Sequence, residues 1–142
     1  MEIKRSVVVL DDCETDQLLL RRAIDETHWF SQVEQFVDPR EALAFFLSQK
    51  ISNTSTAIDL LLLDFRMPHF NGVQFLQQVR TCKLGELIKN VAVMMTVPLL
   101  QCDANAFRNA HQHVHFLVKP LQRDALGSII GATEGKPLHA VS

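Results

Sequence analysis

The chain has 142 residues, of which 47% are hydrophobic and 21% charged, the usual balance of one globular domain rather than of a disordered chain. Fourteen Lys and Arg against sixteen Asp and Glu leave a formal net charge of −2, which argues against a broad basic face for nucleic acid but leaves room for a small local patch. The apolar run near the N-terminus meets two aspartates after five residues, so it is too short for a signal peptide or a membrane span.

Three cysteines, Cys13, Cys82 and Cys102, are odd in number and share no metal-ligand spacing. Reduced thiols in a cytosolic protein are the simplest interpretation. We therefore expect a cytoplasmic location, and nothing in the sequence favours a reactive cysteine.

The N-terminal part of the chain contains two strand–helix units. A β-branched run at 6–10 precedes a helical pattern over 14–27, in which apolar residues recur on one face. Apolar and polar residues then alternate over 33–37, as is typical of an edge strand. Asp38 as N-cap and Pro39 at the first helical position mark the start of a second helix.

Three further units follow. The run at 58–64 does not alternate, which predicts a strand buried on both faces, and the helix after Asn71-Gly72 is expected to stop near Gly85. The remaining elements are a buried strand at 91–96, a short helix around 104–110, a strand at 114–119 and a helix around 125–130. Repeated strand–helix units predict an α/β fold, in which helices cover both faces of a parallel sheet. Residues 135–142 have little periodicity and are predicted to form a flexible tail.

Polar side chains stand at the carboxyl ends of four predicted strands. Asp11 and Asp12 follow the first strand, Asp64 ends the third, Thr96 ends the fourth and Lys119 ends the fifth. In a doubly wound sheet these strand ends share one rim, and ligands bind where the strand order reverses. We therefore expect three carboxylates, a hydroxyl and an ammonium to converge.

Such a cluster requires a cation. Carboxylates a few ångströms apart raise each other's pKa unless a cation lies between them, and all-oxygen ligands suit Mg²⁺. With a metal in place, Asp64 can act as a nucleophile toward a phosphoryl group and form an acyl phosphate. Lys119 would neutralise the phosphoryl oxygens, and Thr96 would donate a hydrogen bond to one of them.

Taken in order, these residues form a specific set with the two dipeptides that follow Asp64. The set consists of Asp11, Asp12, Asp64, Met67-Pro68, Asn71-Gly72, Thr96 and Lys119-Pro120. It resembles the receiver domain of two-component response regulators, over residues 5–134. The resemblance implies a flavodoxin-like (CheY-like) fold, a doubly wound five-stranded parallel sheet in the order 2-1-3-4-5. It also implies a signalling module rather than an enzyme.

The resemblance implies a metal-binding and phosphoacceptor set. Asp64 would accept a phosphoryl group from a phosphohistidine on a partner kinase, with Mg²⁺ as cofactor. Asp12 and Asp64 would bind the metal directly, helped by the backbone carbonyl of Arg66. Asp11 would act mainly through water.

The resemblance also implies a switch and an output surface. Lys119 would contact the phosphoryl oxygens, and Thr96 and Phe116 would form the pair of residues that moves on phosphorylation. The output surface would be the fourth helix, fifth strand and fifth helix, at about 102–134. The same surface is a candidate for homodimer formation.

With no DNA-binding or enzymatic domain attached, the chain resembles the stand-alone, CheY-like class. The stretch 11–24, in which Asp16 lies four residues after Asp12, also resembles single-domain regulators paired with phytochrome-type kinases. The expected partners are a sensor histidine kinase, of the phytochrome type for example, or a phosphotransfer protein, and in addition a downstream protein. Neither nucleic acid nor a membrane is expected as a partner.

Four residues depart from the family pattern or affect the chemistry. Val97 stands where a small residue is usual and should narrow the approach to Asp64, so Val97→Ala should change the rate of phosphoryl decay; an unchanged rate would dismiss the idea. Arg66 can reach the phosphoryl group or the attacking water, and Pro98 stiffens the next loop. Phe116 has no hydroxyl, so any switch here works by packing.

Three other functions are alternatives to a phosphorylated receiver domain. A pseudo-receiver would keep the fold without the chemistry, but every acidic residue, Thr96 and Lys119 are retained. A haloacid-dehalogenase-like phosphohydrolase needs a second aspartate two residues after the first, where this chain has Arg66. A flavodoxin-like FMN binder would meet repulsion between its phosphate and the acidic stretch 11–16.

Some residues also have purely structural interpretations. Asp11 and Asp12 could simply cap the following helix, where carboxylates interact well with the helix dipole. His111, His113 and His115 would share one face of a strand and could invite a metal, but a surface strand start is favoured because no acidic or cysteine partner is near in sequence.

Overall fold

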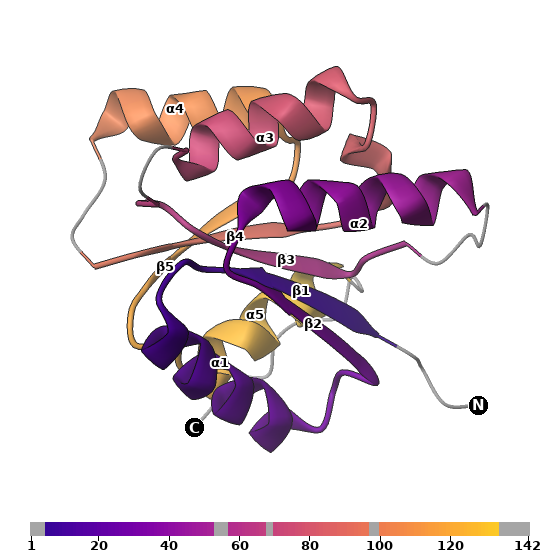
Figure 1. The fold of residues 1–142 in the computed structure, drawn as a ribbon. Helices are drawn as coiled ribbons and strands as arrows, with labels where there is room; N and C mark the ends of the chain where they lie inside the picture. The colour runs from indigo at the N-terminus through magenta and orange to yellow at the C-terminus, as the bar shows by residue number, and fades with distance from the viewer. Residues whose placement is uncertain (1–4, 53–56, 68–69, 97–99, 134–142) are drawn as a thin grey trace.

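The computed structural model describes residues 5–52, 57–67, 70–96 and 100–133, which form one five-stranded sheet with helices on both faces (Figure 1). The strands are β1 (Ser6–Leu10), β2 (Gln32–Phe36), β3 (Leu60–Asp64), β4 (Val91–Met95) and β5 (Val114–Val118). The helices are α1 (Glu14–Thr27), α2 (Pro39–Ile51), α3 (Gly72–Thr81), α4 (Gln101–Ala110) and α5 (Arg123–Thr133), with a short 3₁₀ helix, η1 (Gly85–Leu87).

All neighbouring strands pair in parallel, and the sheet order is β2-β1-β3-β4-β5. The predicted doubly wound α/β fold and its 2-1-3-4-5 order are confirmed. In Figure 1, α2, α3 and α4 lie on one face of the sheet, and α1 and α5 lie on the other.

The four leucines of β3 contribute to the hydrophobic cores on both faces of the sheet. Leu61 and Leu63 belong to the core under α2, α3 and α4, whereas Leu60 and Leu62 belong to the core under α1 and α5. All four are fully buried, since side chains alternate along a strand and both faces are covered by helices. The non-alternating apolar run therefore reports burial on both sides.

The predicted end of α3 near Gly85 is wrong. The helix ends at Thr81, and Lys83 lies in the left-handed region with a φ of 57°. The amide of Leu84 then donates to the carbonyl of Val79, and the Leu84 side chain is buried in the core. The chain turns early because this apolar side chain points back to the sheet. Gly85 instead begins η1.

The other predicted boundaries agree with the structure to within a few residues. The third strand begins at Leu60 rather than at residue 58, because Ile58 forms only an isolated bridge with Ile88. Asp38 caps α2 as predicted, and its side chain accepts a hydrogen bond from the amide of Arg40. Within the described part of the chain, no helix is both long and apolar enough to cross a bilayer. The predicted tail at 135–142 and residues Val97 and Pro98 lie outside the described residues.

Candidate functional site

The carboxyl ends of β1, β3 and β5 bring three charged residues together. Asp11 directly follows β1, Asp64 is the last residue of β3, and Lys119 directly follows β5. Asp11 and Asp64 are adjacent because Leu10 pairs with Leu63 in the sheet register. The Lys119 amide donates to the carbonyl of Met95 at 2.8 Å, which fixes the backbone from which its side chain reaches across the rim.

The Lys119 ammonium is held by three carboxylates. Its Nζ lies 2.8 Å from Asp11 Oδ2, 2.7 Å from Asp16 Oδ2 and 3.0 Å from Asp64 Oδ1. An ammonium has three N–H donors, so these three acceptors match its full capacity. Asp11, Asp12, Asp16, Asp64 and Lys119 together are called the acidic rim below.

Two carboxylates of the acidic rim are buried and therefore need partners. Asp11 is fully buried and Asp64 is 8% exposed, whereas Asp12 is exposed to solvent. Buried carboxylates need a compensating charge and hydrogen bonds. Asp11 obtains both, because its Oδ2 accepts from Lys119 and its Oδ1 accepts from the amide of Cys13 at 3.0 Å. The rim nevertheless contains four carboxylates and one ammonium, so it keeps a net negative charge.

This arrangement raises the pKa values of both Asp64 and Lys119. Burial and the nearby charge of Asp11 raise the pKa of Asp64 from 3.8 to about 6, although Lys119 opposes the shift. Burial alone would lower the pKa of Lys119, but hydrogen bonds to Asp11, Asp16 and Asp64 outweigh it and raise that pKa. Lys119 therefore remains a cation at every physiological pH.

Three carboxylates of the acidic rim have the chemistry of a divalent metal site. Carboxylate oxygens of Asp11, Asp12 and Asp64 all lie within 4.8 Å of one another. These all-oxygen donors fit Mg²⁺, which commonly takes one or two carboxylates and keeps several waters, and the exposed Asp12 leaves room for them. Arg66 is exposed two residues after Asp64. The residues present therefore fit the metal that the sequence predicts.

Residues 7–131 match the family described as response regulator receiver domain. The chain belongs to this family. As a receiver domain it is a part of two-component signalling, and the family consists in general of signalling modules rather than turnover enzymes. The resemblance noted in the sequence is thus confirmed.

Individual relatives agree with this assignment. RpfG of Xanthomonas campestris pv. campestris (strain 8004), a cyclic di-GMP phosphodiesterase response regulator, is 28% identical over 119 residues, which cover 82% of this chain. The matched part of this chain covers only 28% of the length of that relative.

Two solved structures share the fold. The receiver domain of the histidine kinase CKI1 from Arabidopsis thaliana, complexed with Mg²⁺, superposes with a TM-score of 0.73 at 22% identity, over 89% of this chain and 92% of the other. The bacteriophytochrome response regulator RtBRR gives a TM-score of 0.70 at 20% identity, over 99% of this chain and 83% of the other. At these identities the likeness shows the fold alone.

The two predicted switch residues of the receiver domain lie in different surroundings. Thr96 directly follows β4 and is exposed, and among the described residues no hydrogen bond joins it to the acidic rim. Phe116 lies in β5 and is half-buried, with its ring edge-on to Phe107 at a centroid distance of 6.0 Å. Phe107 also contacts Phe65, the residue after Asp64, at 5.7 Å. Ring contacts therefore connect Phe65, the residue that follows β3, with the predicted switch residue Phe116.

The three histidines do not form the shared strand face that their spacing predicts. Of the three, only His115 lies in β5, which begins at Val114. His111 is the C-cap of α4 and is buried, and His113 precedes the strand. His111 Nδ1 accepts from the amide of His113 at 3.0 Å, so its Nε2 must carry the proton that it donates to Ile88 O at 2.9 Å. In the described part of the chain, the acidic rim provides the metal-type cluster, and the histidines do not.

Sequence reasoning missed Asp16 and Phe107 as parts of the site. Asp16 lies in the first turn of α1, where an acidic residue is expected merely from the helix dipole. Its contact with Lys119 spans 103 residues and depends on the end of β5 and the start of α1 meeting at the same rim. The signal that could have found it was its position four residues after Asp12, in the first turn of the helix that begins at the rim. The cysteines have no disulfide partner, since Cys13, Cys82 and Cys102 are all free.

Proposed function

We propose that this chain is a phosphorylation-dependent receiver in which Asp64 accepts a phosphoryl group in the presence of Mg²⁺. The observation that carries the proposal is the convergence of Asp11, Asp16 and Asp64 on the Lys119 ammonium, with Asp12 beside them. A buried nucleophile, a fixed cation and a set of oxygen ligands are what phosphoryl transfer requires of a protein.

In the proposed reaction, a carboxylate oxygen of Asp64 attacks the phosphorus of a phosphohistidine. The new O–P bond forms as the N–P bond breaks, and the imidazole leaves with the electron pair of that bond and takes up a proton. Lys119 already lies 3.0 Å from Asp64 Oδ1, so its ammonium is in place to balance charge on the transferred group. Asp12, Asp64 and the carbonyl of Arg66 would hold Mg²⁺, and Asp11 would act through water. Bound Mg²⁺ would supply charge neutralisation at the phosphoryl oxygens.

The proposed readout of phosphorylation passes through the aromatic contacts. Thr96 and Phe116 are the proposed switch pair, and Phe116 touches Phe107, which in turn touches Phe65 beside Asp64. A ring that moves at one end of this series must displace its neighbour, because packed interiors have few voids.

The surface formed by α4, β5 and α5 is the proposed output surface. Leu100 at the start of α4 and Val118 at the end of β5 are large apolar side chains with 69% and 60% exposure. Such residues can contribute to a contact with a downstream protein or with a second copy of the chain. The proposed donor is a sensor histidine kinase, for example of the phytochrome type, or a phosphotransfer protein, in the cytoplasm.

Intact-mass analysis after incubation with Mg²⁺ and a small phosphodonor tests the proposal. We expect one phosphoryl adduct on the wild-type chain, and none with Asp64→Asn or with a chelator. Asp25→Asn is the matched control, because Asp25 is exposed on the surface of α1 and its carboxylate pairs with Arg21 alone among the described residues. A wild-type chain that forms no adduct would instead support the pseudo-receiver.

A further inference from the structure

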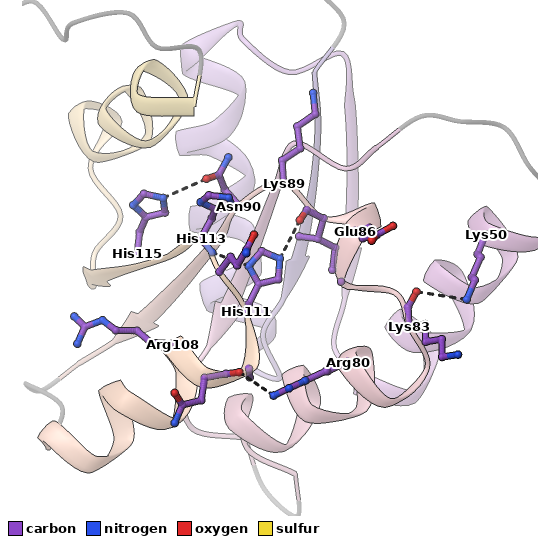
Figure 2. Close-up of a pocket in the computed structure, with 15 residues that line it drawn as sticks. Lys50, Arg80, Lys83, Glu86, Lys89, Asn90, Arg108, His111, His113 and His115 are labelled. Carbon is purple, nitrogen blue, oxygen red and sulfur yellow. Dashed lines mark hydrogen bonds between the residues drawn. The ribbon is translucent and has the colours of Figure 1, made fainter.

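A second group of charged residues lies at the amino ends of the strands, on the opposite side of the molecule from the acidic rim. A pocket of about 1210 Å³ lies there, next to the amino ends of β4 and β5 and the ends of α2, α3 and α4 (Figure 2). Its charged lining consists of Lys50, Arg80, Lys83, Lys89, Arg108 and the single acid Glu86. We call it the basic pocket.

The positive charge of the basic pocket is largely uncompensated. Lys89 pairs with Asp59 at 3.3 Å, but among the described residues no carboxylate forms an ion pair with the other four cations. The whole chain has fourteen basic and sixteen acidic residues, of which five and one line this pocket, so nine and fifteen remain elsewhere. An excess of one charge in a concave site focuses the field and attracts counter-ions.

Two of the cations are held in position by the backbone. Lys50 Nζ donates to the carbonyls of Cys82 and Lys83 at 3.3 and 3.4 Å, and Arg80 Nη1 donates to the carbonyl of Asn109 at 3.0 Å. An ammonium has three N–H donors and a guanidinium has five, so both groups keep donors for a ligand. Side chains that are already ordered lose less entropy when a ligand binds.

The size and lining of the basic pocket indicate the kind of anion. In the view of Figure 2, Lys50 and Lys83 stand at one end and Arg108 at the other, with Arg80 between them. A volume of about 1210 Å³ exceeds what one phosphate needs and suits a ligand with several anionic groups. Among the described residues of the lining, the aromatic side chains are three histidines, and there is no Phe, Trp or Tyr of the kind on which the bases of a single-stranded nucleic acid stack best.

From these observations we propose that the basic pocket binds a small molecule that carries two or more linked phosphate groups. Phosphate oxygens accept charge-assisted hydrogen bonds from Lys and Arg, and linked phosphates can reach cations at separate points of the pocket. The site is distinct from the acidic rim and does not depend on phosphorylation of Asp64.

Calorimetric titration of the full chain with inorganic tripolyphosphate tests the proposal. The buffer contains no Mg²⁺, so that no metal bridges the probe to the acidic rim. We expect saturable binding of one tripolyphosphate per chain, weaker binding of inorganic phosphate, and a loss of affinity as salt is added. The double variant Arg80→Gln/Lys83→Gln should bind at least about ten-fold more weakly, because two charge-assisted contacts are removed.

Arg22→Gln is the matched control, because Arg22 is an exposed cation of α1 on the other face of the sheet. Its affinity should equal that of the wild-type chain, and both variants should keep the wild-type circular dichroism spectrum. The proposal is overturned by non-saturable binding, by an unchanged affinity of the double variant, or by an equal loss in Arg22→Gln. An oligonucleotide that binds more tightly than tripolyphosphate, with the same dependence on Arg80 and Lys83, would reassign the pocket to nucleic acid.

Discussion

The acidic rim and the basic pocket lie at opposite edges of the same sheet, yet they use charge differently. At the rim, three carboxylates converge on the partly buried Lys119 ammonium at 2.7 to 3.0 Å. At the pocket, the cations are exposed and spread over several helix ends, and Lys89 alone has a carboxylate partner among the described residues.

The difference follows from which parts of the fold carry the charges. Strand ends such as Asp11 and Asp64 are positioned by a buried sheet, so their side chains meet at fixed distances in a poorly solvated place. Lys and Arg at helix ends reach into water on long side chains, where each interaction is weak. Loss of a buried charge at the rim should therefore have a large effect on stability, and loss of an exposed charge at the pocket a small one.

The largest expected effect comes from Lys119→Met. Loss of the ammonium leaves Asp11 and Asp64 buried without a counter-charge, which should lower the free energy of unfolding by about 3–5 kcal/mol at neutral pH. Addition of Mg²⁺ should restore part of this loss, because the metal supplies a replacement cation. Urea unfolding with and without Mg²⁺ measures both effects.

Lys89→Met is the matched control at the pocket edge. The Lys89–Asp59 pair is 3.3 Å long, and the Lys89 side chain is 51% exposed, so its removal should cost less than about 1 kcal/mol. Equal losses of stability in the two methionine variants would contradict the comparison.

The next effect has the opposite sign and depends on pH. The folded-state pKa of Asp64 is about 6 against an ordinary value of 3.8, so the folded state binds this proton more tightly than the unfolded state. Stability from this group is therefore present below about pH 4 and is lost as the pH rises through about 6, by about 2–3 kcal/mol. In buffer with a chelator, Asp64→Asn should be more stable than the wild-type chain by this amount at about pH 7.5, and equal to it at about pH 4. A stability difference that does not change with pH would refute this prediction.

A pair of glycines compares packing at the two edges. A Cβ at Gly72 would lie 3.0 Å from the carbonyl oxygen of Asp64 and 3.2 Å from the buried ring of Phe107, whereas a Cβ at Gly85 would meet nothing within 4 Å. Gly72→Ala should therefore destabilise the fold by about 1–3 kcal/mol through overpacking. Gly85→Ala should change stability by less than about 0.5 kcal/mol. Thermal unfolding of both variants decides whether the rim is packed more tightly than the pocket edge.

The smallest effect expected at the acidic rim concerns Asp16. Its side chain is 35% exposed, and without it Lys119 keeps Asp11 and Asp64, so Asp16→Asn should change stability by about 1 kcal/mol or less. A less firmly held ammonium should slow phosphoryl transfer to Asp64 by up to about five-fold. The rate of adduct formation measures this effect, and Asp25→Asn on the same helix should leave the rate unchanged.

Much of the fold could be predicted because buried parallel strands leave a clear pattern. The run Leu60–Leu63 is apolar throughout and ends on a charge, so both the strand and its rim residue are visible in the sequence. Asp38 and Pro39 likewise predict the start of α2, because both residues are favoured at the N-terminus of a helix. The strand order, in contrast, came from the resemblance to receiver domains rather than from the pattern itself.

The rest depends on contacts between distant parts of the chain. Nothing near Thr81 in the sequence shows that Leu84 will turn back into the core and end α3. The spacing of the histidines suggests a strand face, but the position of His111 is determined by its bond to Ile88, 23 residues away. The basic pocket is equally hidden, because its cations come from separate elements and the net charge of the chain is negative.

The central claim is that the acidic rim makes Asp64 the Mg²⁺-dependent phosphoacceptor. Borohydride reduction of the chain after treatment with Mg²⁺ and a small phosphodonor tests it most directly, because the reagent reduces an acyl phosphate to an alcohol at the residue that carried it. Peptide mass spectrometry should find homoserine at position 64 and at no other aspartate. Homoserine at another position, or an unmodified residue 64 in a chain that carries a phosphoryl adduct, would contradict the account.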